Sequence, residues 1–124
     1  MKYRTYMRMP QAVNALGALA HEHRLAVYRL LVERGPEGLS AGVIAQQVGL
    51  APSSLTFHVQ ALQRASLITR RRVSRQLFYA ADFDVMKALI GYLTENCCGR
   101  VRAYGTACEP ASLAGRRKHL RRAG

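Results

Sequence analysis

The chain has 124 residues, 49% of them hydrophobic, which is enough for one globular domain with one core and too little for two. No apolar run approaches the roughly 20 residues that span a bilayer, and residues 1–10 lack the apolar centre of a secretory signal, so we expect a cytoplasmic protein. Nineteen Lys and Arg residues against seven Asp and Glu residues give a net charge of +12, which favours a polyanionic partner, either nucleic acid or an anionic membrane surface.

Two amphipathic patterns occupy the first quarter of the chain. Residues 11–20 place apolar side chains such as Val13 and Leu16 on one face, which predicts a short helix. Residues 21–34 predict a second helix or a bent continuation of the first, with the charged residues off its apolar stripe. The glycines and proline of residues 35–38 predict a loop.

The segment from Ser40 to Leu62 contains two helical patterns separated by a short break. Ser40 can cap the first helix, and Gly49 breaks the run because glycine adopts a left-handed conformation at little cost. Pro52 suits the first turn of the second helix, where its missing N–H is harmless. The buried stripe predicted for this second helix is Leu55, Val59 and Leu62.

The opposite face of the second helix carries short hydrogen-bonding side chains in place of the usual mixture of Glu and Lys. This layout predicts a helix-turn-helix whose second helix enters a DNA major groove. The alternative interpretation is a pair of amphipathic helices in an ordinary helical domain. The candidate DNA-contacting residues of this helix are Ser53, Ser54, Thr56, His58, Gln60 and Arg64.

A basic β-hairpin follows directly. Residues 67–73 and 77–80 have strand-forming side chains, and residues 74–76 can form the turn between them. The hairpin arginines can straddle phosphates or enter the minor groove, although charges also protect a sheet edge from aggregation. A helix-turn-helix followed by such a hairpin is a winged helix. The candidate phosphate-contacting residues are Arg70, Arg71, Arg72 and Arg75.

Asp82 can cap a last helix that runs from residue 83 to about residue 96. Its apolar residues cover more than one narrow stripe, so we expect a homodimer with the first helix in the interface. The expected fold is mainly α (α+β): a winged helix-turn-helix of about five helices plus a β-hairpin wing. Residues 1–98 are expected to form the DNA-binding and dimerisation domain, and residues 99–124 an inducer loop and a flexible basic C-terminal tail.

Three cysteines lie in the last third of the chain, at Cys97, Cys98 and Cys108. In a cytoplasmic chain, clustered cysteines favour metal binding or a redox response over structural disulfides. An odd number of cysteines also argues against a complete disulfide framework.

These features together resemble the ArsR/SmtB family of metalloregulatory repressors. The similarity runs from about residue 12 to residue 96 and is carried by LAHEHRLAVYRLL, by LSAGVIAQQVGLAPSSLTFHVQALQRASLI and by the wing residues RRR…RQLFYAA. Thr56, His58, Leu62 and Leu67 match the family's serine–x–His–Leu…Leu run, with Ser66 where the family usually has glycine. The resemblance implies a dimeric winged-helix repressor that leaves its operator when an inducer binds, and it assigns His58 to DNA contact.

The resemblance also narrows the choice of inducer. The family's zinc-type site needs a histidine on the last helix, but no histidine lies between His58 and His119. The arsenic site formed by a Cys-x-Cys pair at the helix-turn-helix is missing too, because residues 35–66 contain no cysteine. The three cysteines instead resemble the arsenic ligands that some family members carry near the C-terminus. We expect As(III) as the inducer, with Sb(III) or methylarsenite as alternatives, bound by Cys97, Cys98 and Cys108, and no organic cofactor.

Two further hypotheses concern the same thiols. In the first, oxidation is the trigger, and Cys97 or Cys98 forms a disulfide with Cys108. The second, a thiol enzyme, is not expected, because the sequence has no Cys-x-x-Cys, no phosphate-binding glycine loop and no base paired with a nucleophile. The expected partners are therefore double-stranded operator DNA and a second copy of the chain, with no membrane.

Overall fold

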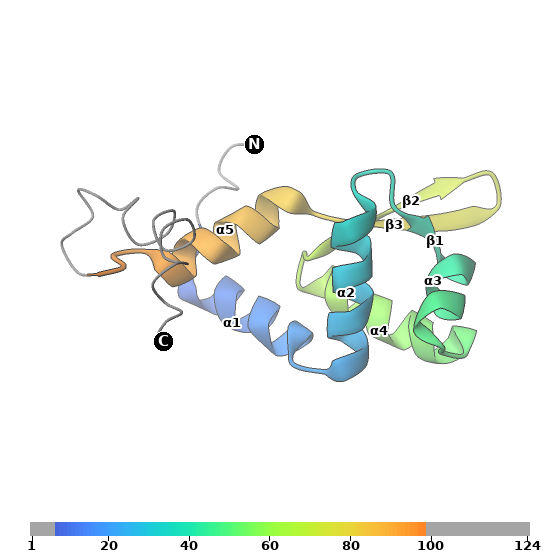
Figure 1. The fold of residues 1–124 in the computed structure, drawn as a ribbon, viewed down its shortest axis with the longest axis horizontal. Helices are drawn as coiled ribbons and strands as arrows, with labels where there is room; N and C mark the ends of the chain where they lie inside the picture. The colour runs from blue at the N-terminus through green and yellow to red at the C-terminus, as the bar shows by residue number, and fades with distance from the viewer. Residues whose placement is uncertain (1–6, 99–124) are drawn as a thin grey trace, which may run out of the picture. The chain divides into compact units, whose positions relative to one another are not determined.

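The computed structural model describes residues 7–98, which form five helices and a three-stranded antiparallel sheet (Figure 1). This architecture confirms the predicted winged helix-turn-helix. The chain divides into two compact units between Tyr92 and Leu93, and the fold described below is that of the first. In chain order the elements are α1 (Met9–Leu19), α2 (Glu22–Arg34), β1 (Leu39–Ser40), α3 (Ala41–Val48), α4 (Pro52–Arg64), β2 (Ile68–Val73), β3 (Gln76–Ala81) and α5 (Phe83–Thr94).

The wing is the hairpin of β2 and β3, which extends beyond the helices in Figure 1. Val73 pairs with Gln76, so the two strands are joined by a loop of only two residues, Ser74 and Arg75. Ser74 has a φ of 61°, the left-handed conformation that two-residue hairpin loops require. The ladder continues to the pair of Ile68 with Ala81, and it aligns the wing firmly with the end of α4.

A short strand that the sequence did not predict completes the sheet. In β1, Leu39 pairs with Tyr79 and Ser40 with Phe78, which gives the strand order β1-β3-β2. The loop reaches β3 through Gly38, whose φ is 75° and where a Cβ would overlap the carbonyl oxygen of Tyr79. Only glycine satisfies both conditions.

Helix α1 packs into the core through a row of alanines. Its buried residues are the alanines Ala12, Ala15 and Ala18, whereas Val13 is 59% exposed and Leu16 is 42% exposed. Small alanine side chains allow α1 to approach α2 and α4 closely, and this leaves the larger apolar residues on the outside. Val13 and Leu16 therefore lie on one face of the helix, as predicted, and that face is exposed in the single chain.

The end of α4 is closed by a Schellman motif. The N–H of Leu67 donates to the carbonyl of Leu62 (3.1 Å), and the N–H of Ser66 donates to the carbonyl of Gln63 (2.9 Å). Ser66 occupies the left-handed position with a φ of 64°. Leu62 and Leu67 are both fully buried, so this turn connects the helix-turn-helix to the wing through the hydrophobic core.

Asp82 caps α5 as predicted. Its Oδ1 accepts hydrogen bonds from the backbone N–H groups of Asp84 (3.1 Å) and Val85 (3.2 Å). The helix ends at Thr94, slightly before the expected residue 96. None of the helices within residues 7–98 is long and apolar enough to cross a lipid bilayer.

Candidate nucleic-acid interface

Helices α3 and α4 form the predicted helix-turn-helix. Ser40 Oγ accepts a hydrogen bond from the N–H of Val43 (3.3 Å), which caps α3 at its start. Gly49 then adopts a φ of 72° and ends the helix, and α4 begins three residues later at Pro52. The turn between the two helices is therefore short, and the buried Ile44 and Leu55 on either side of it belong to the same core.

The buried and exposed faces of α4 are largely those predicted. Leu55, Val59 and Leu62 are buried in the core. Thr56 is exposed, but its hydroxyl donates to the carbonyl of Pro52 (3.0 Å), so its hydrogen-bond donor is already used within the helix. The predicted DNA-contacting residues of α4 that are exposed are Ser53, Ser54, Thr56, Gln60 and Arg64.

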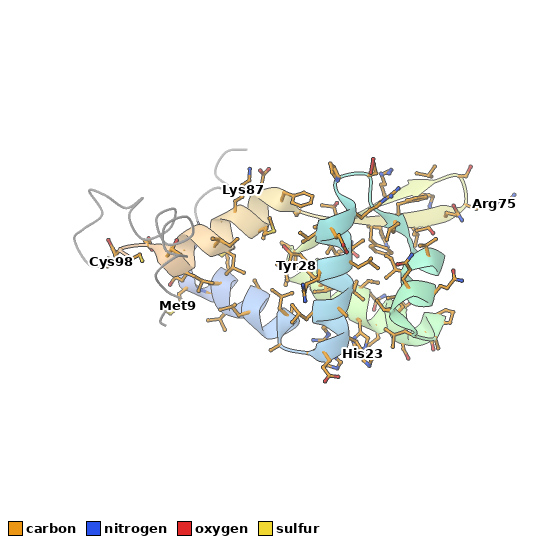
Figure 2. All side chains as sticks on the ribbon, viewed as in Figure 1. Met9, His23, Tyr28, Arg75, Lys87 and Cys98 are labelled. Atoms are coloured by element: carbon orange, nitrogen blue, oxygen red, sulfur yellow. The ribbon has the colours of Figure 1, made fainter. Side chains whose placement is uncertain are left out.

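His58 does not lie on this exposed face. The structure corrects its placement, because the side chain is only 7% exposed and packs against the start of α2. Nε of Arg24 donates to His58 Nδ1 (3.3 Å), and the rings of His21 and His23 lie 4.6 and 5.5 Å from the His58 ring. Figure 2 shows His23 at the N-terminal end of α2. His58 therefore positions α4 against α2, while its predicted contact with DNA stays a prediction.

The surroundings of His58 favour its neutral form. Burial, followed by the charges of His21, Arg24 and His23, lowers the pKa of His58 below its usual 6.5. The hydrogen bond agrees with this direction, because the Arg24 guanidinium is always a donor and Nδ1 must then be the acceptor.

Phe57 is a residue on the exposed face of α4 that the sequence reasoning did not select. Its side chain is 59% exposed, and the Arg24 guanidinium lies 5.7 Å from the ring centre. The spacing of Ser53, Phe57, Gln60 and Arg64 is the signal that could have found it, because these four positions repeat every three or four residues.

The wing arginines fall on two faces of β2, because successive strand residues point to opposite sides. Arg71 lies on the face away from α4, where it donates to the carbonyl of Glu37 (2.8 Å) and stacks over Phe78 at 5.1 Å. Arg70 and Arg72 share the other face, and Arg75 lies at the tip of the hairpin (Figure 2). All four are exposed, but Arg71 is already engaged within the protein.

A polar hollow of about 330 Å³ joins the wing to α4. It is lined by Gln60, Gln63, Arg64 and Arg70, so two guanidinium groups and two amides converge on one space beside the polar face of the helix. Guanidinium groups hold DNA phosphates in protein complexes, and a glutamine amide can bind either a phosphate or a base edge. The structure thus brings together three residues that the sequence selected separately: Gln60, Arg64 and Arg70.

The sequence and the fold of this chain were compared with those of known proteins. A model described as a helix-turn-helix domain matches residues 19–71. HlyU from Vibrio cholerae is 31% identical, with a TM-score of 0.56 and with 72% of this chain and 94% of that chain covered. A second solved structure of the same protein is described as reduced HlyU. Mb0332 from Mycobacterium bovis is 26% identical, with a TM-score of 0.58 and with 70% of this chain and 81% of that chain covered. Its structure is described as a homodimeric winged helix-turn-helix DNA-binding domain and as a possible ArsR-family regulator. The chain belongs to the ArsR family of transcriptional regulators.

NolR from Rhizobium meliloti supports the same assignment. It is 30% identical over 84 residues, which cover 68% of this chain and 66% of NolR. The chain therefore spans about two thirds of the length of that relative. In this ArsR-family protein, α3 and α4 are therefore the two helices of a DNA-binding helix-turn-helix, and its homologues are transcriptional regulators, which are not enzymes.

The cysteine pair of this ArsR-family chain lies beyond the end of α5. The two sulfur atoms, Cys97 Sγ and Cys98 Sγ, are 3.6 Å apart and exposed. Cys97 is a free thiol and Cys98 is disulfide-bonded in this structure. The third predicted ligand, Cys108, lies outside the described residues. Within residues 7–98 no group of three or more His, Cys, Asp or Glu side chains is arranged to hold a metal ion.

Proposed function

We propose that this ArsR-family regulator is a homodimeric repressor that releases its operator when As(III) binds its C-terminal cysteines. The observation that carries the operator-binding part is the convergence of Gln60, Arg64 and Arg70 beside the exposed face of α4. The net charge of +12 adds a sequence-independent attraction to DNA phosphates.

Helix α1 supplies the argument for the dimer. Met9, Val13 and Leu16 repeat at spacings of four and three residues, and all three are exposed. A continuous apolar stripe on a helix is stable in water only when a partner covers it. A second copy would supply that cover and would place two recognition helices about 34 Å apart, one turn along the DNA groove.

The position of Cys97 beside Cys98 supports a thiophilic inducer once the disulfide of Cys98 is reduced. With metal–sulfur bonds of about 2.3 Å, as in zinc–thiolate sites, two sulfurs 3.6 Å apart would subtend an angle of about 100° at a shared ion. A pyramidal ion such as As(III) accommodates that angle, and Cys108 would provide its third thiolate. As(III) binds thiolates only, so the reduced protein is the form that would respond.

Thiol oxidation is the second candidate trigger. Two observations favour it: Cys98 is disulfide-bonded, and one relative has a structure described as reduced. Formation and loss of that disulfide would then take the place of ion binding, on the same segment that follows α5.

The test requires an operator, which selection from a random duplex library with the reduced wild-type protein would provide. Fluorescence anisotropy then measures release of the labelled duplex on addition of arsenite, antimonite, methylarsenite or peroxide. The variants are Cys97→Ser/Cys98→Ser, Cys108→Ser and, as a control away from the cysteines and from α4, Asn14→Ser.

We expect arsenite to release the wild type and the control but not the Cys97→Ser/Cys98→Ser protein. Release by peroxide alone would select the oxidation trigger. If the double variant still releases DNA normally with arsenite, the proposed inducer site is wrong, while the DNA-binding function stands.

A further inference from the structure

Phe57 lies on the outward face of α4. At 3.6 residues per turn, Ser53, Phe57, Gln60 and Arg64 fall within an arc of about 60°, and Phe57 lies between the hydrogen-bonding residues along the helix. The ring is 59% exposed on a surface whose other members are polar or basic. A single exposed aromatic residue is ordinary by itself, so its position and surroundings carry the argument.

The ring is held in place from the neighbouring helix. The Arg24 guanidinium lies 5.7 Å from the ring centre, within the range of a cation–π interaction, and the His58 ring meets it edge-on at 5.5 Å. Arg24 also donates to His58 Nδ1, so one guanidinium orients both residues. An exposed side chain that is ordered in this way loses little conformational freedom when it binds a partner.

Thr56 adds a second apolar group at the same level of the helix. Its hydroxyl donates to the carbonyl of Pro52, so its methyl group is the part that has no bond within the helix. Thr56 and Phe57 point about 100° apart, so these two apolar groups lie on either side of Ser53 and Gln60, which carry the donors and acceptors of the face.

A major groove offers one apolar group on its base edges, the C5-methyl group of thymine. The other major-groove groups are hydrogen-bond donors and acceptors, which a phenyl ring cannot satisfy. We propose that Phe57 is a specificity-determining residue that contacts a thymine methyl group in each operator half-site. The inference rests on the proposed function, because it needs α4 in the major groove.

The test compares thymine with deoxyuridine, which lacks only the methyl group. Wild-type protein selects its preferred duplex from a random library, and each thymine of the selected site is then replaced in turn by deoxyuridine. Binding of every duplex is measured for wild type, Phe57→Ala, Phe57→Leu and, as a matched variant on the same face, Gln60→Ala. Thermal melting of each variant establishes that it is folded.

We expect one thymine per half-site at which the replacement weakens wild-type binding by about fourfold, the effect of burying one methyl group. Phe57→Ala should bind thymine and deoxyuridine equally well at that position, Gln60→Ala should still distinguish them, and Phe57→Leu should retain part of the difference.

Two results would overturn the inference. One is a selected site that contains no thymine, and the other is a loss of affinity on replacing thymine by deoxyuridine that is equal in wild type and in both Phe57 variants. Selection of no sequence by the wild type would instead refute the proposed function, and this inference with it.

Discussion

Ser66 is the left-handed residue of the Schellman motif that ends α4, and it is the position where the ArsR family usually has glycine. A left-handed conformation costs a non-glycine residue about 1–2 kcal/mol, and glycine recovers part of this while losing more chain entropy on folding. We therefore expect Ser66→Gly to raise the free energy of unfolding by about 0.5–1 kcal/mol. Urea denaturation with an unchanged m-value measures this directly.

A matched control for Ser66→Gly is Ser53→Gly, at an exposed helical position of α4. There glycine should lower the free energy of unfolding by about 0.5 kcal/mol, because no left-handed strain is relieved. Destabilisation by Ser66→Gly would contradict the role given to this turn.

The lowered pKa of His58 makes stability depend on pH. At pH values well above 6.5, the pKa of histidine in the unfolded chain, His58 is neutral in both the folded and the unfolded state. Its titration then takes nothing from the free energy of unfolding. As the pH falls below 6.5 the unfolded chain takes up a proton before the folded one, and stability decreases until the lower folded pKa is passed. We expect the urea concentration at the unfolding midpoint to decrease as the pH is lowered from about 7.5 to about 5.5.

His58→Gln keeps an acceptor for Arg24 but does not titrate, so it should show a weaker pH dependence over the same range. His23→Gln, at an exposed neighbouring position, is the control. If wild type and His58→Gln had the same dependence on pH, the environment described for His58 would be incorrect.

At the scale of the elements, the wing strand β2 divides its arginines between two faces. Arg70 and Arg72 face the side of α4, so each substitution to alanine should weaken DNA binding and lower the slope of log affinity against log salt by about 1. Arg71→Ala should change that slope less, because its guanidinium is bound to the Glu37 carbonyl and Phe78. Anisotropy titrations of a labelled duplex at several salt concentrations provide the measurement. Equal slopes for all three variants would refute the assignment of faces.

Some elements of this fold could be predicted from local sequence patterns, and others could not. Periodicity and turn chemistry predicted α4, the wing and the cap at Asp82, because these depend on neighbouring residues in the chain. The strand β1 could not be predicted, because two residues have no period and their pairing depends on the close approach of Gly38 to β3. Such pairing is decided by residues about 40 positions apart.

In the candidate site, the exposed positions of α4 followed from its period, and the same period places His58 beside Leu55 and Leu62 on the buried side. The sequence could therefore have predicted that His58 is buried, but not its contacts with Arg24 and His21, which are distant in the chain.

The apolar face of α1 was predicted from its period, but the packing of Ala12, Ala15 and Ala18 into the core was not. Periodicity identifies a stripe, and it does not tell whether the stripe packs in its own chain or on a partner.

For the whole molecule, the exposed stripe of α1 predicts that dimerisation and DNA binding are lost together. Leu16→Glu places a charge in the middle of that stripe, so we expect a monomer with weak, sequence-independent DNA binding. Asn14→Glu adds the same charge to another exposed position of α1 and should remain dimeric. Sedimentation velocity gives the assembly state, and a dimer of Leu16→Glu would show that α1 is not in the interface.

The central claim is that the outward face of α4 reads the base sequence while the basic charge supplies general affinity. The most direct measurement is the ratio of the dissociation constants for a scrambled and a selected duplex, compared between wild type and Gln60→Ala at one salt concentration. We predict that the ratio falls by about tenfold in Gln60→Ala while the affinity for the scrambled duplex is unchanged. An unchanged ratio, with affinity lost equally for both duplexes, would contradict the claim.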